Sequence, residues 1–152
     1  MKLSTKGKYG LYAMDYLAQH EGDGPQPLKS VAEIGVQEDY LEQLLGILRR
    51  AGLVTTVRGA QGGYQLARPA DEITVGDIIA ATEGPLSLAD CVSDGGCCEK
   101  STECRARRVW GYLSHAIDGL LTSITLRDML TQSEFCSDHI PKKTMPDEPP
   151  AK

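Results

Sequence analysis

The sequence predicts a mainly α-helical fold that carries one small β-hairpin. Apolar side chains recur at helical spacing in several stretches of the 152 residues, and one stretch, 53–69, combines β-branched residues with a glycine-rich centre. No apolar run approaches the roughly 20 residues that span a bilayer, so we expect no membrane partner. This length suits one domain, or a small domain with an appended dimerisation element.

Two helices are expected before residue 36. In the first, aromatic and apolar residues follow the i, i+3, i+4, i+7, i+8 spacing of an amphipathic helix, namely Tyr9, Tyr12, Ala13, Tyr16 and Leu17. Ser4 or Thr5 can cap this helix. After a loop rich in glycine and proline, a short second helix should begin at Leu28 and stop at Gly35.

The third helix is expected over 38–51. Its apolar stripe is formed by Leu41, Leu44, Leu45, Leu48 and Ala51. Gly52 is suited to end it. Leu53–Val57 is β-branched and "YQLA" alternates, with the turn Arg58–Gly63 between them. Helix, short helix, helix and hairpin in this order indicate a winged helix-turn-helix domain, which we place at residues 1–70.

The second half of the chain is predicted to be helical on either side of a cysteine-rich loop. Thr74 and Asp77 resemble a capping box that opens a linking helix. A long helix then carries an apolar stripe, formed by Ala106, Val109, Trp110, Leu113, Ile117, Leu120 and Leu121. We expect this stripe to pack against a second copy of the chain. Thr125 and Asp128 begin one more short helix. We expect a linking helix at 71–90 and a cysteine loop at 91–104. The dimerisation helix and the short helix should follow at 105–133, and a disordered tail at 134–152.

Charge is distributed unevenly along the chain. The net charge is −5, but residues 1–70 hold 8 basic and 7 acidic side chains, a balance of +1. Residues 71–104 hold 1 basic and 8 acidic side chains, a balance of −7. Residues 105–152 hold 7 basic and 6 acidic side chains, a balance of +1. The first 70 residues can therefore present a basic face to phosphate in spite of the acidic total.

The exposed face of helix 38–51 has polar groups suited to the edges of bases in the major groove. Glu42 can accept a hydrogen bond from a cytosine amino group, and Gln43 can pair with adenine. Tyr40 and Ser30 can bond phosphates.

The predicted hairpin adds a second contact. Arg58 at its tip has the reach and charge for a narrow minor groove, and Gly59 lets the backbone approach. Lys6, near the start of the first helix, is a further candidate DNA contact. The alternative interpretation is an ordinary solvated helix beside a hairpin-tip charge, but the combination of helix and wing favours DNA binding.

Four of the five cysteines, Cys91, Cys97, Cys98 and Cys104, fall within 14 residues. The N-terminus lacks the apolar core of a secretory signal, so we expect a cytoplasmic protein whose thiols stay reduced. Steps of six from Cys91 to Cys97 and from Cys98 to Cys104 are wider than those of zinc fingers and favour an iron–sulfur cluster. The alternative is a loop whose thiols bind no metal. Cys136 stands alone near the C-terminus.

Several motifs together resemble one known family. "LSTKGKYGLYAM", "DYLEQLLGILRRAGLV", "VRGAQGGYQLARP", "ITVGDIIAATEG", the spaced cysteines and "SITLRDML" occur in the order typical of the iron–sulfur-cluster regulator family of winged-helix repressors. The resemblance covers residues 1 to about 133. It implies a homodimer joined through the helix at 105–121 and bound to a roughly palindromic double-stranded operator. It also assigns base reading and positioning to Tyr40, Glu42 and Gln43, and the wing contact to Arg58 and Gly59.

The same resemblance implies three cysteine ligands, at Cys91, at Cys97 or Cys98, and at Cys104. Some members carry a histidine ligand three residues after the last cysteine, where this chain has Arg107, which cannot ligate. Others use an acidic residue of the partner's first helix, where this chain has Lys8. The second cysteine of the Cys97–Cys98 pair, a small molecule or a weak ligand such as Glu103 can fill the fourth position. Both a 2Fe–2S and a 4Fe–4S cluster are compatible with these ligands.

The predicted function is a DNA-binding transcriptional regulator, acting as a repressor, that senses iron–sulfur status or redox and nitrosative stress. One alternative is a cluster-free regulator of the same family that uses a thiol switch or a partner protein. Another is an iron–sulfur electron carrier. An enzyme is not expected, because we find no nucleophile–base pair and because "GAQGGY" lacks the Lys-Ser/Thr of a phosphate-binding loop.

Overall fold

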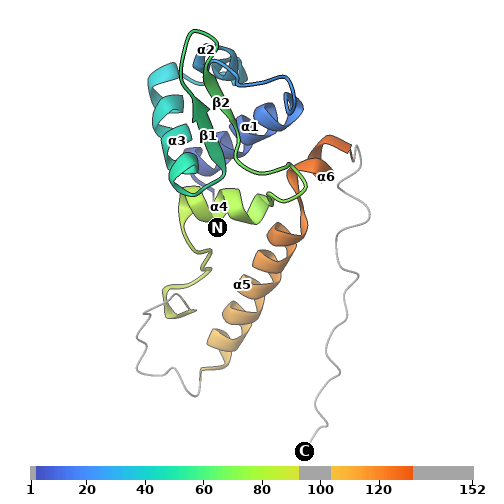
Figure 1. Ribbon diagram of the computed structural model, residues 1–152. Helices are drawn as coiled ribbons and strands as arrows, with labels where there is room; N and C mark the ends of the chain where they lie inside the picture. The colour runs from blue at the N-terminus through green and yellow to red at the C-terminus, as the bar shows by residue number, and fades with distance from the viewer. Residues whose placement is uncertain (1–2, 93–103, 132–152) are drawn as a thin grey trace, which may run out of the picture.

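The computed structural model describes residues 3–92 and 104–131 (Figure 1). Its elements in chain order are α1 (Thr5–Gln19), α2 (Leu28–Val31), the 3₁₀ turn η1 (Ala32–Ile34), α3 (Glu38–Arg50), β1 (Val54–Val57), β2 (Gly63–Leu66), α4 (Val75–Glu83), the 3₁₀ turn η2 (Asp90–Val92), α5 (Arg105–Ser123) and α6 (Leu126–Thr131). This order confirms the mainly α-helical fold with a two-stranded hairpin. The predicted disordered tail at 134–152 lies outside the described residues.

Local signals explain most of the element boundaries. The hydroxyl of Ser4 accepts a hydrogen bond from the Lys6 amide at 3.1 Å and caps α1. Gly35 takes φ 90°, a left-handed conformation that ends the second helical segment. Thr74 and Asp77 form the predicted capping box at the start of α4, because each side chain accepts a hydrogen bond from the other residue's amide at 3.0 Å.

The buried face of α1 differs from the predicted stripe. Tyr12 is 45% exposed, and the buried residues are Gly7, Gly10, Ala13, Met14, Leu17 and Ala18. The cause is the close approach of α4. A Cβ atom at Gly7 would lie 2.7 Å from Glu83 Oε1, and one at Gly10 would lie 2.9 Å from Thr82 Cγ2. Glycines therefore occupy the crossing, and the tyrosines are rotated away from its centre.

One hydrophobic core joins α1, α3, the hairpin, α4 and α6. Its fully buried side chains include Met14, Leu41, Leu45, Leu48, Ile78 and Leu126. Complete burial of such a side chain contributes about 1.5–3 kcal/mol. The chain after α5 returns to this core, because the Leu126 amide donates to the Ile73 carbonyl at 2.9 Å and the Val75 amide donates to the Ile124 carbonyl at 2.8 Å.

The hairpin is fixed to the rest of the domain at its second strand. β1 and β2 pair antiparallel, with Val54 opposite Leu66 and Val57 opposite Gly63. Tyr64 in β2 also exchanges two 2.8 Å backbone hydrogen bonds with Gln26, in the loop before α2. These bonds hold the wing against the helix-turn-helix.

Helix α5 leaves the compact part of the molecule, as Figure 1 shows. None of its residues is buried. Val109, Trp110, Tyr112, Leu113 and Leu120 are exposed large hydrophobic residues on this helix. Its C-terminal end is attached through α4, where a Cβ at Gly76 would lie 2.7 Å from Thr122 Cγ2 and 3.1 Å from the Thr122 amide nitrogen.

Gly76→Ala should destabilise the protein by about 1–3 kcal/mol, because the added methyl group overpacks against the α5 backbone. Gly46→Ala is the matched control in α3, where the added Cβ would approach no described side chain more closely than Arg50, whose Nη1 would lie 3.9 Å away. There the better helix propensity of alanine should stabilise by up to about 1 kcal/mol. Urea denaturation of both variants measures the two effects, and shifts of the same sign would contradict the close packing at Gly76.

Candidate DNA-binding surface and cysteine segment

Helix α3 divides into a buried apolar side and an exposed polar side. Leu41, Leu44, Leu45 and Leu48 are buried, while Glu42 and Gln43 are exposed on the opposite side as predicted. The first turn of α3 is acidic and the last turn carries Arg49 and Arg50. Carboxylates at the start of the helix would repel phosphate, so this end suits hydrogen-bond donors on base edges better than the DNA backbone.

Tyr40 packs against the start of α1. Its ring lies edge-on to Tyr9, with ring centroids 6.4 Å apart and planes at 78°. Tyr9 also meets Tyr12 edge-on at 6.0 Å, and Lys8 Nζ lies 5.4 Å and 5.7 Å from the centroids of these two rings. The first turns of α1 and α3 are therefore joined by an aromatic cluster. The helical pattern of α1 indicated Tyr9 as a core residue and gave no sign of this contact.

The N-terminus of α1 is held by a carboxylate from α4. Glu83 Oε1 accepts hydrogen bonds from the Ser4 amide at 3.2 Å, from the Gly7 amide at 2.9 Å and from the Ser4 hydroxyl. The Ser4 hydroxyl bond is the main cause that lowers the pKa of the Glu83 carboxyl below its usual value. Lys6 lies exposed in the same turn.

The remaining predicted DNA contacts come from α2 and the wing. Ser30 is half-buried in α2, where its amide donates to the Pro27 carbonyl at 3.0 Å. Arg58 and Gly59 are exposed in the turn between the strands, and Gly59 takes φ 116°. In Figure 1 this turn and α5 lie at opposite ends of the molecule. Tyr40 thus lies in the contact between α3 and the start of α1, whereas Arg58 and Gly59 lie apart from it in the turn of the hairpin.

Two of the predicted cysteine ligands lie in the described part of the chain. Cys91 lies in η2 and Cys104 is the N-cap residue of α5; both thiols are half-buried, and neither forms a disulfide. Cys97 and Cys98 lie outside the described residues. Arg107 donates a hydrogen bond from Nε to the Cys91 carbonyl at 2.9 Å, so this guanidinium holds the backbone of a predicted ligand.

The donor chemistry of the segment fits an iron–sulfur cluster in part. Among residues 3–92 and 104–131, no group of three or more histidine, cysteine or acidic side chains is placed to hold a metal ion. A complete site in this segment would therefore have to draw further donors from residues 93–103, which include Cys97 and Cys98. Four soft thiolates suit iron, whereas Arg107 offers no lone pair. Beside Cys91 a hollow of about 320 Å³ is lined by Val92, Arg107, Arg108, Gly111 and His115.

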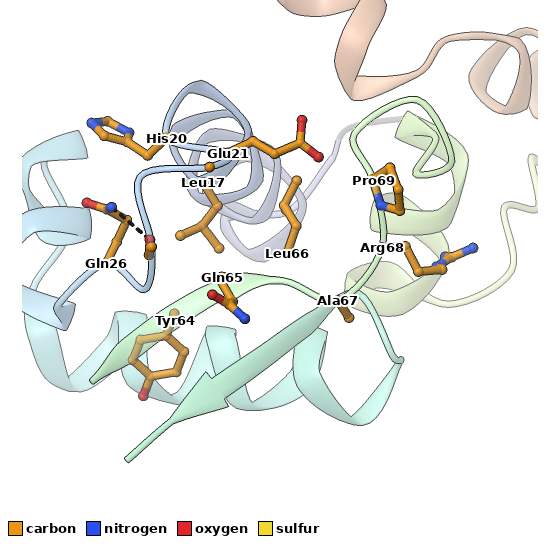
Figure 2. A pocket seen from close by; sticks show the side chains of 12 residues that line it. Leu17, His20, Glu21, Gln26, Tyr64, Gln65, Leu66, Ala67, Arg68 and Pro69 are labelled. Carbon is orange, nitrogen blue, oxygen red and sulfur yellow. Dashed lines mark hydrogen bonds between the residues drawn. The ribbon is translucent and has the colours of Figure 1, made fainter. Parts of the chain in front are cut away.

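A larger hollow of about 410 Å³ lies elsewhere, between the end of α1, the loop after it and β2 (Figure 2). Leu17 and Leu66 form its apolar base. Glu21, one of several polar residues that line it, accepts a hydrogen bond from the Ala70 amide at 3.0 Å and pairs with Arg127 of α6. None of the predicted DNA contacts or cysteines lines this hollow.

Comparisons with known proteins identify the family. The model of the Rrf2 family, described as an iron-dependent transcriptional regulator, matches residues 3–132. The transcriptional regulator CymR of Bacillus subtilis (strain 168) is 44% identical over 135 residues, which are 88% of this chain and 93% of CymR.

Two solved structures agree with this match. The structure of CymR, described as the global cysteine regulator of B. subtilis, has a TM-score of 0.72 at 45% identity and covers 85% of this chain and 95% of that one. T. potens IscR has a TM-score of 0.70 at 50% identity, with 86% of each chain covered. Among the described residues, no helix is both long enough and apolar enough to cross a bilayer. The chain is a DNA-binding transcriptional regulator rather than an enzyme, and it belongs to the Rrf2 family.

Proposed function

We propose that this chain is a homodimeric repressor whose affinity for a palindromic operator depends on an iron–sulfur cluster bound by Cys91, Cys97, Cys98 and Cys104. The observation that carries the proposal is the position of Cys91. It follows α4, which packs on α1, and Arg107 holds its carbonyl against α5. One short segment therefore adjoins both the DNA-binding domain and the long helix. We place this activity in the cytoplasm, where thiols stay reduced.

For DNA binding we assign the exposed side chains of α3 to the major groove. Glu42 and Gln43 read base edges, and Arg58 with Gly59 enters the minor groove. We assign phosphate contacts to Lys6, Ser30 and Tyr40. Because the start of α3 is acidic, most of the attraction to phosphate comes from α1 and the wing.

For dimerisation we assign the apolar face of α5. Val109 is 55% exposed and Trp110 is 42% exposed, and no residue of α5 is buried. Large hydrophobic residues in a row on one helix are typical of a protein–protein interface. A twofold dimer would place two recognition helices on two half-sites of a palindrome.

For sensing we assign the four thiolates of the cysteine segment as cluster ligands, and four thiolates accommodate a 2Fe–2S or a 4Fe–4S cluster. When bound, the cluster supplies a redox-active iron centre that reports iron–sulfur status or oxidative and nitrosative stress. Arg107 fixes one end of the segment to α5, and α4 connects the same end to α1. A coupling of about 1–3 kcal/mol between these sites would shift operator affinity roughly 5- to 150-fold.

A cluster-free regulator is the second candidate, with a thiol switch or a partner protein in place of iron. It is favoured by Arg107 at the position of the family histidine, and by the likeness to a protein described as a cysteine regulator. An absorbance spectrum of anaerobically purified protein separates the two, because a colourless and iron-free sample supports this candidate. Family membership favours both regulators over an electron carrier.

Arg58→Ala should weaken binding to a duplex enriched from a random-sequence library by about 1–3 kcal/mol, because the wing loses its cation in the minor groove. Fluorescence anisotropy measures the change. Arg68→Ala is the matched control: it removes the same charge at the other end of the hairpin, where Arg68 lies 3.7 Å from Asp77. An equal loss in both variants would show that only total charge matters.

Cys91→Ala should abolish stoichiometric iron, because the segment loses a thiolate while the backbone carbonyl that Arg107 contacts is kept. Iron and sulfide analysis of anaerobic preparations measures this result. Cys136→Ala is the control and should keep full iron content. Retained iron in Cys91→Ala would refute the ligand assignment.

Val109→Asp should convert the dimer into monomers, because the introduced charge would be desolvated in the interface. Analytical ultracentrifugation measures the mass. His115→Asp adds the same side chain on the side of α5 that faces the hollow beside Val92, and it should leave the dimer intact. Monomeric wild-type protein at micromolar concentration would rule out the proposed interface.

A further inference from the structure

The contact between Glu83 and the first turn of α1 connects two elements that are far apart in the sequence. Glu83 is the last residue of α4, and one of its carboxylate oxygens accepts hydrogen bonds from the amides of Ser4 and Gly7 and from the Ser4 hydroxyl. These amides belong to the N-terminal turn of a helix, where donors lack partners within the helix and a negative charge is stabilised. The carboxylate therefore acts as a cap supplied by another helix.

The packing around this contact leaves it little freedom. The absence of a side chain at Gly7 leaves room for the carboxylate, because an added Cβ would lie 2.7 Å from Glu83 Oε1. One turn later Gly10 approaches the side chain of Thr82, which is buried and donates its hydroxyl to the Ile78 carbonyl at 2.9 Å. Two consecutive residues at the end of α4, Thr82 and Glu83, thus contact α1.

Lys6 lies between the two residues that Glu83 contacts. Its amide donates to the Ser4 hydroxyl at 3.1 Å, and the same hydroxyl donates to Glu83. The Lys6 side chain is exposed. The backbone from which this cation extends is therefore held in the turn that Glu83 contacts. The lowered pKa of the Glu83 carboxyl keeps it ionised, and able to accept all three bonds, at neutral pH.

We propose that Glu83 is a positioning residue for DNA binding, which holds the first turn of α1 so that Lys6 meets a DNA phosphate. This inference rests on the proposed DNA contacts. The proposal and simple electrostatics predict different effects of changes at Glu83 on DNA affinity. Glu83 is itself an exposed negative charge near the DNA-binding face, so Coulomb repulsion alone would make its neutralisation strengthen binding. Positioning through hydrogen bonds instead requires a side chain long enough to bring an oxygen acceptor to the amides of Ser4 and Gly7, whether or not it is charged.

Two conservative variants distinguish the effect of side-chain length from the effect of charge. Glu83→Asp keeps the charge but is one methylene shorter, so it should lose the bonds to Ser4 and Gly7. Glu83→Gln removes the charge but keeps an oxygen acceptor in the same place. The probe is a duplex enriched from a random-sequence library by the wild-type protein, and affinity is measured by anisotropy over a range of salt concentrations.

We expect Glu83→Asp to bind about three- to tenfold more weakly and the slope of log K against log salt to fall by about 1 per protomer, as for one lost phosphate contact. Glu83→Gln should bind within about twofold of the wild type. In a Lys6→Ala background Glu83→Asp should have no further effect, because the contact it positions is already absent. Circular dichroism and thermal melting confirm that each variant is folded.

Unchanged affinity of Glu83→Asp together with tighter binding by Glu83→Gln would overturn the proposal, because that pair of results shows a charge effect. Additive losses from Lys6→Ala and Glu83→Asp would also overturn it. Failure of the underlying DNA-binding assignment is recognised separately: the wild-type protein would then enrich no duplex, or Arg58→Ala would bind as well as the wild type.

Discussion

The close crossing of α1 over α4 is the constraint on which the rest of this structure depends. On α1, Gly10 lets the helices approach to a distance that a methyl group would prevent, because an added Cβ would lie 2.9 Å from Thr82 Cγ2, and Gly7 leaves room for the Glu83 carboxylate. This crossing attaches α4 to the helix-turn-helix, and α6 adds a second attachment where it packs on α1. The same contact fixes the first turn of α1, which lies beside α3, and it fixes the end of α4, from which the chain runs to Cys91.

The charges of the chain explain why such positioning matters. The net charge is −5, and the first turn of α3 is acidic. A regulator with a net negative charge cannot rely on non-specific attraction to DNA, so we expect each cation of the proposed DNA-binding surface to be well placed. Lys6 is placed by a capped helix terminus and Arg58 by a hairpin that is bonded to the loop before α2.

Sequence patterns predicted the elements of this fold well, because helical spacing, glycine stops and capping boxes are local signals. Thr74 with Asp77 shows this plainly: the two residues lie three apart and cap each other as predicted. The same reasoning was wrong for Tyr12, because the apolar spacing of α1 could not show that glycines would face α4. The bond between Glu83 and Ser4 joins residues 79 positions apart, and no local pattern predicts it. The sequence shows that the Arg107 guanidinium has no lone pair for a metal, but it does not predict the bond of this side chain to the Cys91 carbonyl, which depends on how η2 and α5 pack.

The most direct test of the central claim compares one anaerobic preparation in two states, with its iron retained and with its iron removed by a chelator. Both samples are titrated against the same library-selected duplex at a fixed salt concentration. Coupling between the cysteine segment and the DNA-binding surface predicts affinities that differ by roughly 5- to 150-fold. Identical affinities in the two states would contradict it and leave a DNA-binding dimer that does not sense iron.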